Sequence, residues 1–341
     1  MKHEPGSVLL QARGLVKEYP IRQGIIPHTV GVVKAVDGVD FVLHRGETLG
    51  LVGESGCGKS TVGRMLVGLE PPTAGDVLLE GQPLQTQLRR GRGRDGVRLQ
   101  MVFQDTFSSL NPRKRVGDIL TAPMLYHGLA TPKTAWREAC RLLEQVGLPA
   151  AAFERYPHEF SGGQRQRIGL ARALSLKPEL IVCDEPVSAL DVSIQAQILN
   201  LIKDLQKELG LTYLFIGHGL AAVNYVSDRI AVMYLGKIVE VAPAKALFET
   251  PAHPYTKALC DAAPVPDPAL RRRERIVLAG EIPSSIDPPK GCRFHPRCPY
   301  ATEVCKREEP KLLPCAALPA DHLTACHHTE ALLAKRGNVP V

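Results

Sequence analysis

The sequence has no hydrophobic run long enough to cross a membrane. No uncharged apolar stretch reaches the roughly 18 residues that a transmembrane helix needs. The first residues, Met1-Lys-His-Glu-Pro5, also lack the apolar core of a signal peptide. Hydrophobic residues make up 44% of the 341 residues and charged residues 23%, which allows a sizeable core. We therefore expect a cytosolic chain with one large domain and an appendage, or with two domains.

A strong charge imbalance and closely spaced cysteines are lacking as well. The formal net charge of +7 permits contact with a membrane surface or nucleic acid but indicates neither. The glycine-spaced arginine run over 89–94 contains no aromatic residue, so we interpret it as a solvated loop and expect no nucleic-acid partner. The nine cysteines form no C-x-x-C pair. In a cytosolic protein they indicate buried thiols or a metal site rather than disulfides.

One short stretch fits a nucleotide-binding pattern. Residues 53–61 follow G-x-x-x-x-G-K-[ST] and lie between an apolar run, 48–52, and a helical pattern, 62–69. Glycines let backbone N–H groups close around phosphate oxygens, Lys59 supplies a positive charge, and the Ser60 hydroxyl suits Mg²⁺. The predicted nucleoside-triphosphate site consists of Gly53, Glu54, Ser55, Gly56, Cys57, Gly58, Lys59, Ser60 and Thr61.

Two later stretches also carry groups suited to phosphate chemistry. The turn Ser161-Gly162-Gly163-Gln164 precedes a predicted helix over 168–176, and it is either a second anion-binding turn or only an N-cap. The apolar run from residue 180 ends in Asp184 and Glu185. The first carboxylate suits Mg²⁺, and the second suits activation of an attacking water.

The remaining pattern alternates strands and helices, which predicts an α/β fold. We expect strands over 8–19, 33–43, 76–80, 99–103 and 211–216, a loop over 21–31, helices over 135–146 and 193–209, and a hairpin over 229–241. The second helix should bury Ile198, Leu199, Ile202, Leu205 and Leu209 on one face. Tyr19, Gln104 and His218 each lie at or after a strand end, where a structural role is the commoner one for Tyr19 and His218 taken singly.

Taken together, these residues resemble the ATP-binding-cassette (ABC) ATPases. The resemblance rests on the Gly53 loop, Gln104, Ser161-Gly-Gly-Gln164, Asp184-Glu185, Asp191 and His218, in this order, and covers about residues 8–250. The second glycine turn discriminates, because most other P-loop proteins lack it. It implies a P-loop ABC-type nucleotide-binding domain over 1–250 with a mixed sheet core, an antiparallel β subdomain and a helical subdomain over about 116–176.

The resemblance also implies a mechanism. Two chains would form a head-to-tail sandwich, with each ATP between the Gly53 loop of one chain and the Ser161 turn of its partner. By this resemblance, Tyr19 would stack on adenine, Lys59, Ser60 and Thr61 would bind the phosphates and Mg²⁺, and Gln104 and Asp184 would bind Mg²⁺, with Gln104 also sensing the γ phosphate. The partner's ATP would be bound by Ser161, Gly162, Gly163 and Gln164, and Asp191 would communicate across the dimer. Catalysis would use Lys59, His218 and Glu185, the last as general base.

The sequence departs from the ABC pattern at two positions. Phe160 replaces the commoner leucine before the Ser161 turn and keeps an apolar anchor. Gly219 stands where an acidic residue usually follows His218. Since the histidine itself is present, we expect activity, with its positioning affected.

A narrower resemblance points to a substrate. Residues 156–167, 185–191 and 253–259 are similar to the ATP-binding subunits of bacterial dipeptide and oligopeptide importers, in particular to the second of their two nonidentical ATPases. This implies a peripheral protein on the cytoplasmic face of the bacterial inner membrane. Its partners would be a second ATP-binding subunit, two membrane permease subunits and an extracytoplasmic peptide-binding protein.

Three alternatives stay open beside peptide import. Nickel or other small-solute importers share much of the pattern. Soluble ABC ATPases usually carry two cassettes or a long coiled-coil insertion, and neither occurs here. A nonenzymatic nucleotide or redox sensor would have damaged catalytic positions, whereas Glu185 and His218 are both intact.

From residue 251 onward the sequence is proline-rich, which predicts a loop-rich C-terminal extension over 251–341. It contains Cys292, Cys298, Cys305, Cys315 and Cys326. Their spacing leaves zinc, an iron–sulfur cluster and unligated buried thiols open. The resemblance to peptide importers implies a [4Fe–4S] cluster on Cys292, Cys298, Cys305 and Cys326. We interpret the other cysteines, Cys57, Cys140, Cys183 and Cys260, as ordinary.

Overall fold

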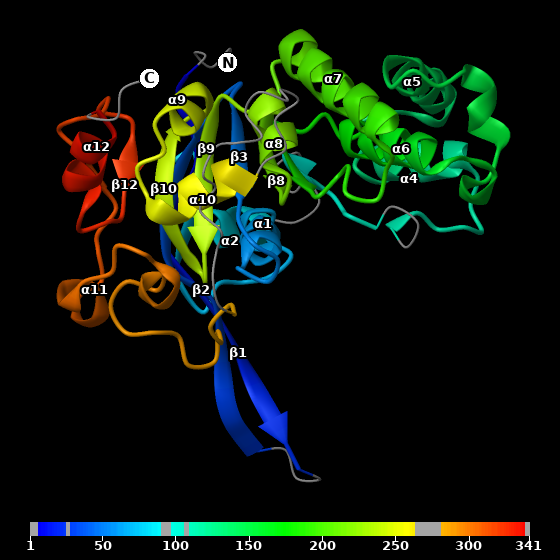
Figure 1. Cartoon of the computed structure of the whole chain (residues 1–341). Coiled ribbons are helices and arrows are strands. Elements are labelled where there is room, and N and C mark those ends of the chain that lie inside the picture. Colours follow the sequence, from blue (N-terminus) through cyan, green and yellow to red (C-terminus); the bar gives the residue numbers. More distant parts are fainter. Residues whose placement is uncertain (1–5, 25–27, 90–96, 106–108, 263–280, 338–341) are drawn as a thin grey trace.

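The computed structural model describes residues 6–24, 28–89, 97–105, 109–262 and 281–337. They form an antiparallel four-stranded sheet of order β2-β1-β4-β5 and an eight-stranded mixed sheet of order β11-β12-β10-β9-β3-β8-β7-β6 (Figure 1). The strands are β1 (Val8–Gln23), β2 (His28–His44), β3 (Thr48–Val52), β4 (Ala74–Leu79), β5 (Gln82–Pro83), β6 (Leu99–Val102), β7 (Leu180–Asp184), β8 (Thr212–Gly217), β9 (Arg229–Tyr234), β10 (Lys237–Pro243), β11 (Leu313–Pro314) and β12 (Leu323–Thr324).

The helices lie on and beside these sheets. They are α1 (Lys59–Leu66), α2 (Leu84–Arg89), α4 (Val116–Tyr126), α5 (Pro132–Gln145), α6 (Gly162–Leu174), α7 (Val192–Leu209), α8 (Leu220–Val226), α9 (Ala244–Glu249), α10 (Pro254–Ala262), α11 (Glu303–Arg307) and α12 (Thr329–Gly337). Among the helices of the described residues, none is both long and apolar enough to span a bilayer. The predicted α/β fold with a mixed sheet, an antiparallel sheet and a helical part is confirmed.

The parallel part of the large sheet positions the polar residues of interest. β3, β6, β7, β8 and β9 pair in parallel, and every residue of β3, β7 and β8 is buried. Strands covered on both faces read as continuous apolar runs, which is the pattern of these segments. Val52 pairs with Gly217, and Asp184 pairs with Ile216. The carboxyl ends of β3, β7 and β8 therefore meet at one edge of the sheet.

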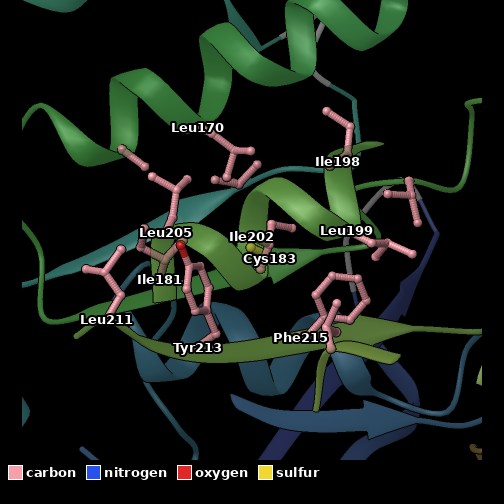
Figure 2. Close-up of a cluster of buried hydrophobic side chains, with 14 of the residues drawn as sticks. Leu170, Ile181, Cys183, Ile198, Leu199, Ile202, Leu205, Leu211, Tyr213 and Phe215 are labelled. Carbon is pink, nitrogen blue, oxygen red and sulfur yellow. The ribbon is translucent and has the colours of Figure 1, made fainter. Parts of the chain in front are cut away.

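The long helix α7 covers β7 and β8 with an apolar face. Figure 2 shows Ile198, Leu199, Ile202 and Leu205 beside strand residues such as Ile181, Tyr213 and Phe215, and all seven are buried. Leu209 is the exception in the predicted face, because its side chain at the last turn is 43% exposed. The helix begins at Asp191, which caps it, and ends before Gly210, whose φ of 64° is left-handed.

The predicted loop over residues 21–31 is wrong. β1 continues to Gln23 and β2 begins at His28, with Ile21 paired to Gly31 and Gln23 to His28. Antiparallel pairing satisfies backbone N–H and C=O groups along this arm, and residues 25–27 lie outside the described part. The hairpin extends away from the rest of the molecule (Figure 1).

The helical part and the C-terminal part flank the sheets on opposite sides in Figure 1. α4, α5 and α6, all within the predicted segment 116–176, pack on one another. In the C-terminal part, β12 pairs antiparallel with β10 and β11 pairs with β12, so the extension lengthens the large sheet. The domain boundary at residue 250 stays a prediction. The arginine-rich residues 90–94 lie outside the described residues.

Candidate nucleotide site and cysteine cavity

The segment over 53–61, called the phosphate-type loop below and the same as the Gly53 loop, leads from β3 into α1, and its backbone conformation requires two glycines. A Cβ at Gly53 would lie 2.1 Å from the carbonyl oxygen of Met233, and one at Gly58 would lie 2.1 Å from that of Ala35. Gly58 also has a left-handed φ of 107°. The Lys59 Nζ donates to the carbonyl oxygens of Gly53 and Glu54 at 2.8 and 2.9 Å. The loop therefore has the compact backbone and the lysine that the motif predicts.

The end of β7 lies against the first turn of α1. The Ser60 hydroxyl donates to Asp184 Oδ1 at 2.8 Å, and Asp184 is only 4% exposed. Burial raises the pKa of Asp184, while the hydrogen bond from Ser60 opposes the shift. A hydroxyl and a carboxylate in contact are a donor set that suits Mg²⁺. The structure thus brings together two of the three predicted Mg²⁺ ligands.

Glu185 collects two other predicted residues around one carboxylate oxygen. Gln104 Nε2 and His218 Nδ1 each lie 3.2 Å from Glu185 Oε2. Glu185 has a φ of 46°, a left-handed conformation that costs a non-glycine residue on the order of 1–3 kcal/mol. Strain of this kind gathers at functional sites. Gln104, Glu185 and His218 come from three different strand ends, and the parallel pairing of β6, β7 and β8 unites them.

Tyr19 lies beside the phosphate-type loop. Its hydroxyl donates to the Glu70 carboxylate and interacts with Thr61, and burial raises its pKa. Lys17 Nζ lies 5.3 Å from the centre of the ring. The position next to Thr61 is compatible with a contact to the base of a bound nucleotide, and stacking on adenine stays a prediction.

Ser161 and Asp191 each lie at the start of a helix, α6 and α7 respectively. Ser161 Oγ accepts from the Gln164 backbone N–H at 3.3 Å, and Gln164 Oε1 accepts from the Ser161 N–H at 3.0 Å, so the turn is a capping box for α6. Asp191 caps α7 by accepting from Ile194 N–H. α6 packs on α4, α5 and α7, whereas α1 packs on β2, β7 and β8; both helices also contact β6. N-capping and anion binding use the same end of the helix, so both interpretations of the turn remain.

Four tail cysteines share one cavity. Cys292, Cys298, Cys305 and Cys326 line it together with Phe294. Cys315 is buried and lines a neighbouring cavity instead. Burial raises the pKa of Cys292 to about 12 and that of Cys298 to about 11. In the described part of the chain, no three His, Cys, Asp or Glu side chains are close enough together to hold a single metal ion.

Comparison with known proteins identifies the family of the chain. Residues 36–188 match the family described as ABC transporter, and residues 239–305 match that described as Oligopeptide/dipeptide transporter, C-terminal region. The chain is 52% identical to the oligopeptide transport ATP-binding protein AppF of Bacillus subtilis, over 94% of this chain and 97% of that protein. It is 50% identical to the dipeptide transport ATP-binding protein DppF of Haemophilus influenzae, over 89% and 92%. The chain belongs to the ABC transporter family.

Solved structures agree on the fold of this ABC ATPase. CbiO1 of Clostridium perfringens, part of the ABC transporter complex cbiONQ, matches with a TM-score of 0.60 and 23% identity, over 72% of this chain and 92% of that chain. The dimeric bacterial ABC transporter cassette MJ0796 matches with a TM-score of 0.58 and 24% identity, over 69% and 99%. At this level of identity the likeness shows the fold alone.

The ABC ATPase also contains contacts to its phosphate-type loop that the sequence did not predict. Tyr255 Oη on α10 accepts from the Glu54 backbone N–H at 2.9 Å, and Arg297 forms an ion pair with the Glu54 carboxylate at 2.8 Å. Both partners lie about 200 residues or more from the loop along the chain. No local pattern marks residues that meet across such a separation, so only the folded structure reveals them.

Proposed function

We propose that this ABC ATPase energises the import of dipeptides or oligopeptides through a membrane transporter. The observation that carries the proposal is the C-terminal region over 239–305, whose match is to the oligopeptide/dipeptide transporter region. The relatives that are about 50% identical over nearly the whole chain are named as oligopeptide and dipeptide transport ATP-binding proteins.

In the proposed reaction, residues 53–61 bind the triphosphate of ATP. Ser60, Asp184 and Gln104 would hold Mg²⁺, which neutralises charge on the β and γ phosphates when bound. Glu185 acts as general base on a water in line with the γ phosphate, and His218 contacts that phosphate. The shared contacts of Gln104 and His218 with Glu185 Oε2 support this arrangement, because they hold the base in place from both sides.

The Ser161 turn and Asp191 serve a second subunit in this proposal. The turn of one chain closes over the ATP bound at the Gly53 loop of its partner, and within one chain the turn and the loop lie at the starts of different helices, α6 and α1. The partner is a second ATP-binding subunit, nonidentical to this chain. ATP binding closes the pair, closure moves two membrane permease subunits, and an extracytoplasmic peptide-binding protein delivers the peptide. The chain would then lie on the cytoplasmic face of the bacterial membrane.

We further propose that Cys292, Cys298, Cys305 and Cys326 hold a [4Fe–4S] cluster. A cluster is larger than a single ion, so its four thiolates line a cavity rather than meet at one point. The observation that supports the proposal is that the four thiols line one cavity. Because burial raises the pKa of Cys292 and Cys298, the positive charge of bound iron would stabilise their thiolates.

Anaerobic purification tests the cluster. The native chain and the Cys315→Ser variant should both contain iron, sulfide and visible absorbance, because Cys315 lies outside the shared cavity. Cys298→Ser should lose most of all three. An anaerobic native sample without iron and sulfide would exclude the cluster.

Uptake of labelled peptides tests the transport proposal. Cells carrying Lys59→Ala should lose uptake of peptides two to six residues long, whereas Lys245→Ala, which removes an exposed lysine on α9, should transport like the native chain. Nickel ions serve as a parallel substrate. Loss of nickel uptake with unchanged peptide uptake would assign the chain to metal import, and no transport defect in either assay would contradict an importer role.

A further inference from the structure

The phosphate-type loop contains an acidic residue. Glu54 follows Gly53 directly, within the segment predicted to bind the polyanionic triphosphate. A carboxylate close to a triphosphate opposes binding through like-charge repulsion, which is strong where water is partly excluded. Glu54 is partly buried, with a side chain that is 21% exposed. An acid at this position therefore requires a compensating positive charge.

Arg297 supplies that charge from the C-terminal extension. Its Nη1 donates to Glu54 Oε2 at 2.8 Å and its Nη2 donates to Oε1 at 3.1 Å. The guanidinium also lies 6.0 Å from the ring centre of Tyr234. The Arg297 side chain is only 6% exposed. A buried bidentate contact of this kind balances the negative charge of the carboxylate and holds its orientation.

The same segment forms a wall of the cysteine cavity. Arg297 ends a short 3-10 turn, His295–Arg297, that lies between Phe294 and Cys298. The Phe294 ring packs 5.3 Å from Tyr234 and 5.4 Å from Tyr255, centre to centre, and Tyr255 accepts the hydrogen bond from the Glu54 N–H. The backbone and the side chain of Glu54 are thus both held by groups that contact this turn.

We propose that Arg297 is a positioning residue for nucleotide binding: it neutralises Glu54 and holds the phosphate-type loop to the cysteine-bearing turn. The inference rests on the proposed phosphate role of residues 53–61. Because coupling between two sites is reciprocal, bound nucleotide must also stabilise the turn over 292–298. Arg297 touches neither the proposed Mg²⁺ ligands nor the general base, so its effect falls on nucleotide affinity rather than on the chemical step.

Titration of the purified full-length chain with a fluorescent, non-hydrolysable ATP analogue tests this role. Arg297→Ala should weaken affinity about tenfold, within the range usual for coupling between sites. Glu54→Gln should bind at least as tightly as the native chain, and the double variant should recover most of the loss. Arg307→Ala, which removes an arginine 77% exposed on α11, is the matched control and should bind like the native chain.

The outcomes separate this inference from the nucleotide site itself. If Lys59→Ala binds the analogue normally, the proposed site is wrong. If Lys59→Ala loses binding but Arg297→Ala does not, the role of Arg297 is wrong. A double variant as weak as Arg297→Ala alone would overturn charge compensation. Hydrogen exchange of residues 292–298 gives a second measurement: the analogue should slow it in the native chain but not in Arg297→Ala, and equal slowing in both would contradict the coupling.

Discussion

Within the described residues, two glutamate–histidine pairs have opposite surroundings. His218 Nδ1 lies 3.2 Å from Glu185 Oε2, and the two side chains are 60% and 17% exposed. His322 Nε2 lies 2.7 Å from Glu240 Oε1, and both side chains are fully buried. The Glu240 carboxylate also accepts from the backbone N–H groups of Ala252 and His253, each at 2.8 Å. The two pairs have the same chemistry, and burial distinguishes them.

The difference separates a reactive site from a structural anchor. A fully buried carboxylate that accepts several short hydrogen bonds stabilises the fold, because removing one of its partners leaves buried polar groups without hydrogen bonds. A longer contact, open to solvent and built on the left-handed backbone of Glu185, can rearrange around a ligand. We therefore expect matched substitutions in the two pairs to affect different properties of the protein.

The largest expected effect is on hydrolysis by Glu185→Gln. If Glu185 is the general base, the amide cannot accept the proton of water, and the rate of phosphate release should fall by about 100-fold or more. Nucleotide affinity and the thermal midpoint of unfolding should stay near their native values, because Glu185 is partly exposed. A residual rate within about tenfold of the native rate would remove Glu185 from that role.

The matched change Glu240→Gln should affect stability instead. The carboxylate of Glu240 has three hydrogen-bond partners, the backbone N–H groups of Ala252 and His253 and the His322 Nε2. The NH2 group of the glutamine would face at least one of these partners without accepting a hydrogen bond, so the free energy of unfolding should fall by about 2–3 kcal/mol. Urea denaturation measures the loss, and the hydrolysis rate per folded molecule should be unchanged. A loss in hydrolysis with normal stability would break the distinction between the two pairs.

Acid should lower the stability of the fold through His253, whose backbone N–H donates to Glu240 of the buried pair. Burial lowers the pKa of His253 to about 4, against an ordinary value of 6.5. The unfolded chain therefore binds more protons between these values, so the contribution to stability is present above pH 6.5 and is lost as the pH falls towards 4. We expect a loss of about 2 kcal/mol between about pH 6.5 and pH 5. His253→Asn should give a flatter profile, and equal slopes would exclude this histidine as the cause.

The smallest expected effect concerns the exposed pair and Gly219. This glycine occupies the N-cap of α8 without a side-chain cap, and a Cβ there would have no atom within 4 Å. The carboxylate introduced by Gly219→Asp should accept hydrogen bonds from backbone N–H groups of the first turn of α8 and stabilise the chain by about a few tenths of a kcal/mol. Gly219→Ala lacks the oxygen and should give no such gain. A destabilised aspartate variant would show that the turn after His218 requires glycine.

Much of the arrangement of the candidate nucleotide site could be predicted because its signals are local. The Gly53 loop and the Asp184-Glu185 pair each follow an apolar strand in the sequence, and parallel pairing then brings the strand ends together. The Ser161 turn begins a helix, as its residues predict. Motifs carry this information because a few adjacent residues determine both the backbone and the chemistry.

Contacts between distant residues could not be predicted. Glu240 and His322 lie 82 residues apart, and Glu54 and Arg297 lie 243 residues apart. Glu54 lies in the motif over 53–61, but nothing in that motif indicates Arg297 as its partner. The loop predicted over 21–31 was wrong for a related reason, because pairing with the other strand determines the structure of this segment.

Because β12 pairs with β10, the C-terminal extension also covers a sheet edge that could otherwise pair with another molecule. β10 would otherwise be the outermost strand of the large sheet, with a row of backbone N–H and C=O groups open to strands of other molecules. Two residues of β12, Leu323 and Thr324, occupy that edge. A chain shortened after α9 would keep the predicted nucleotide motifs but leave Glu240 and Val241 of β10 without their β12 partners, and an open strand edge of this kind favours pairing between molecules.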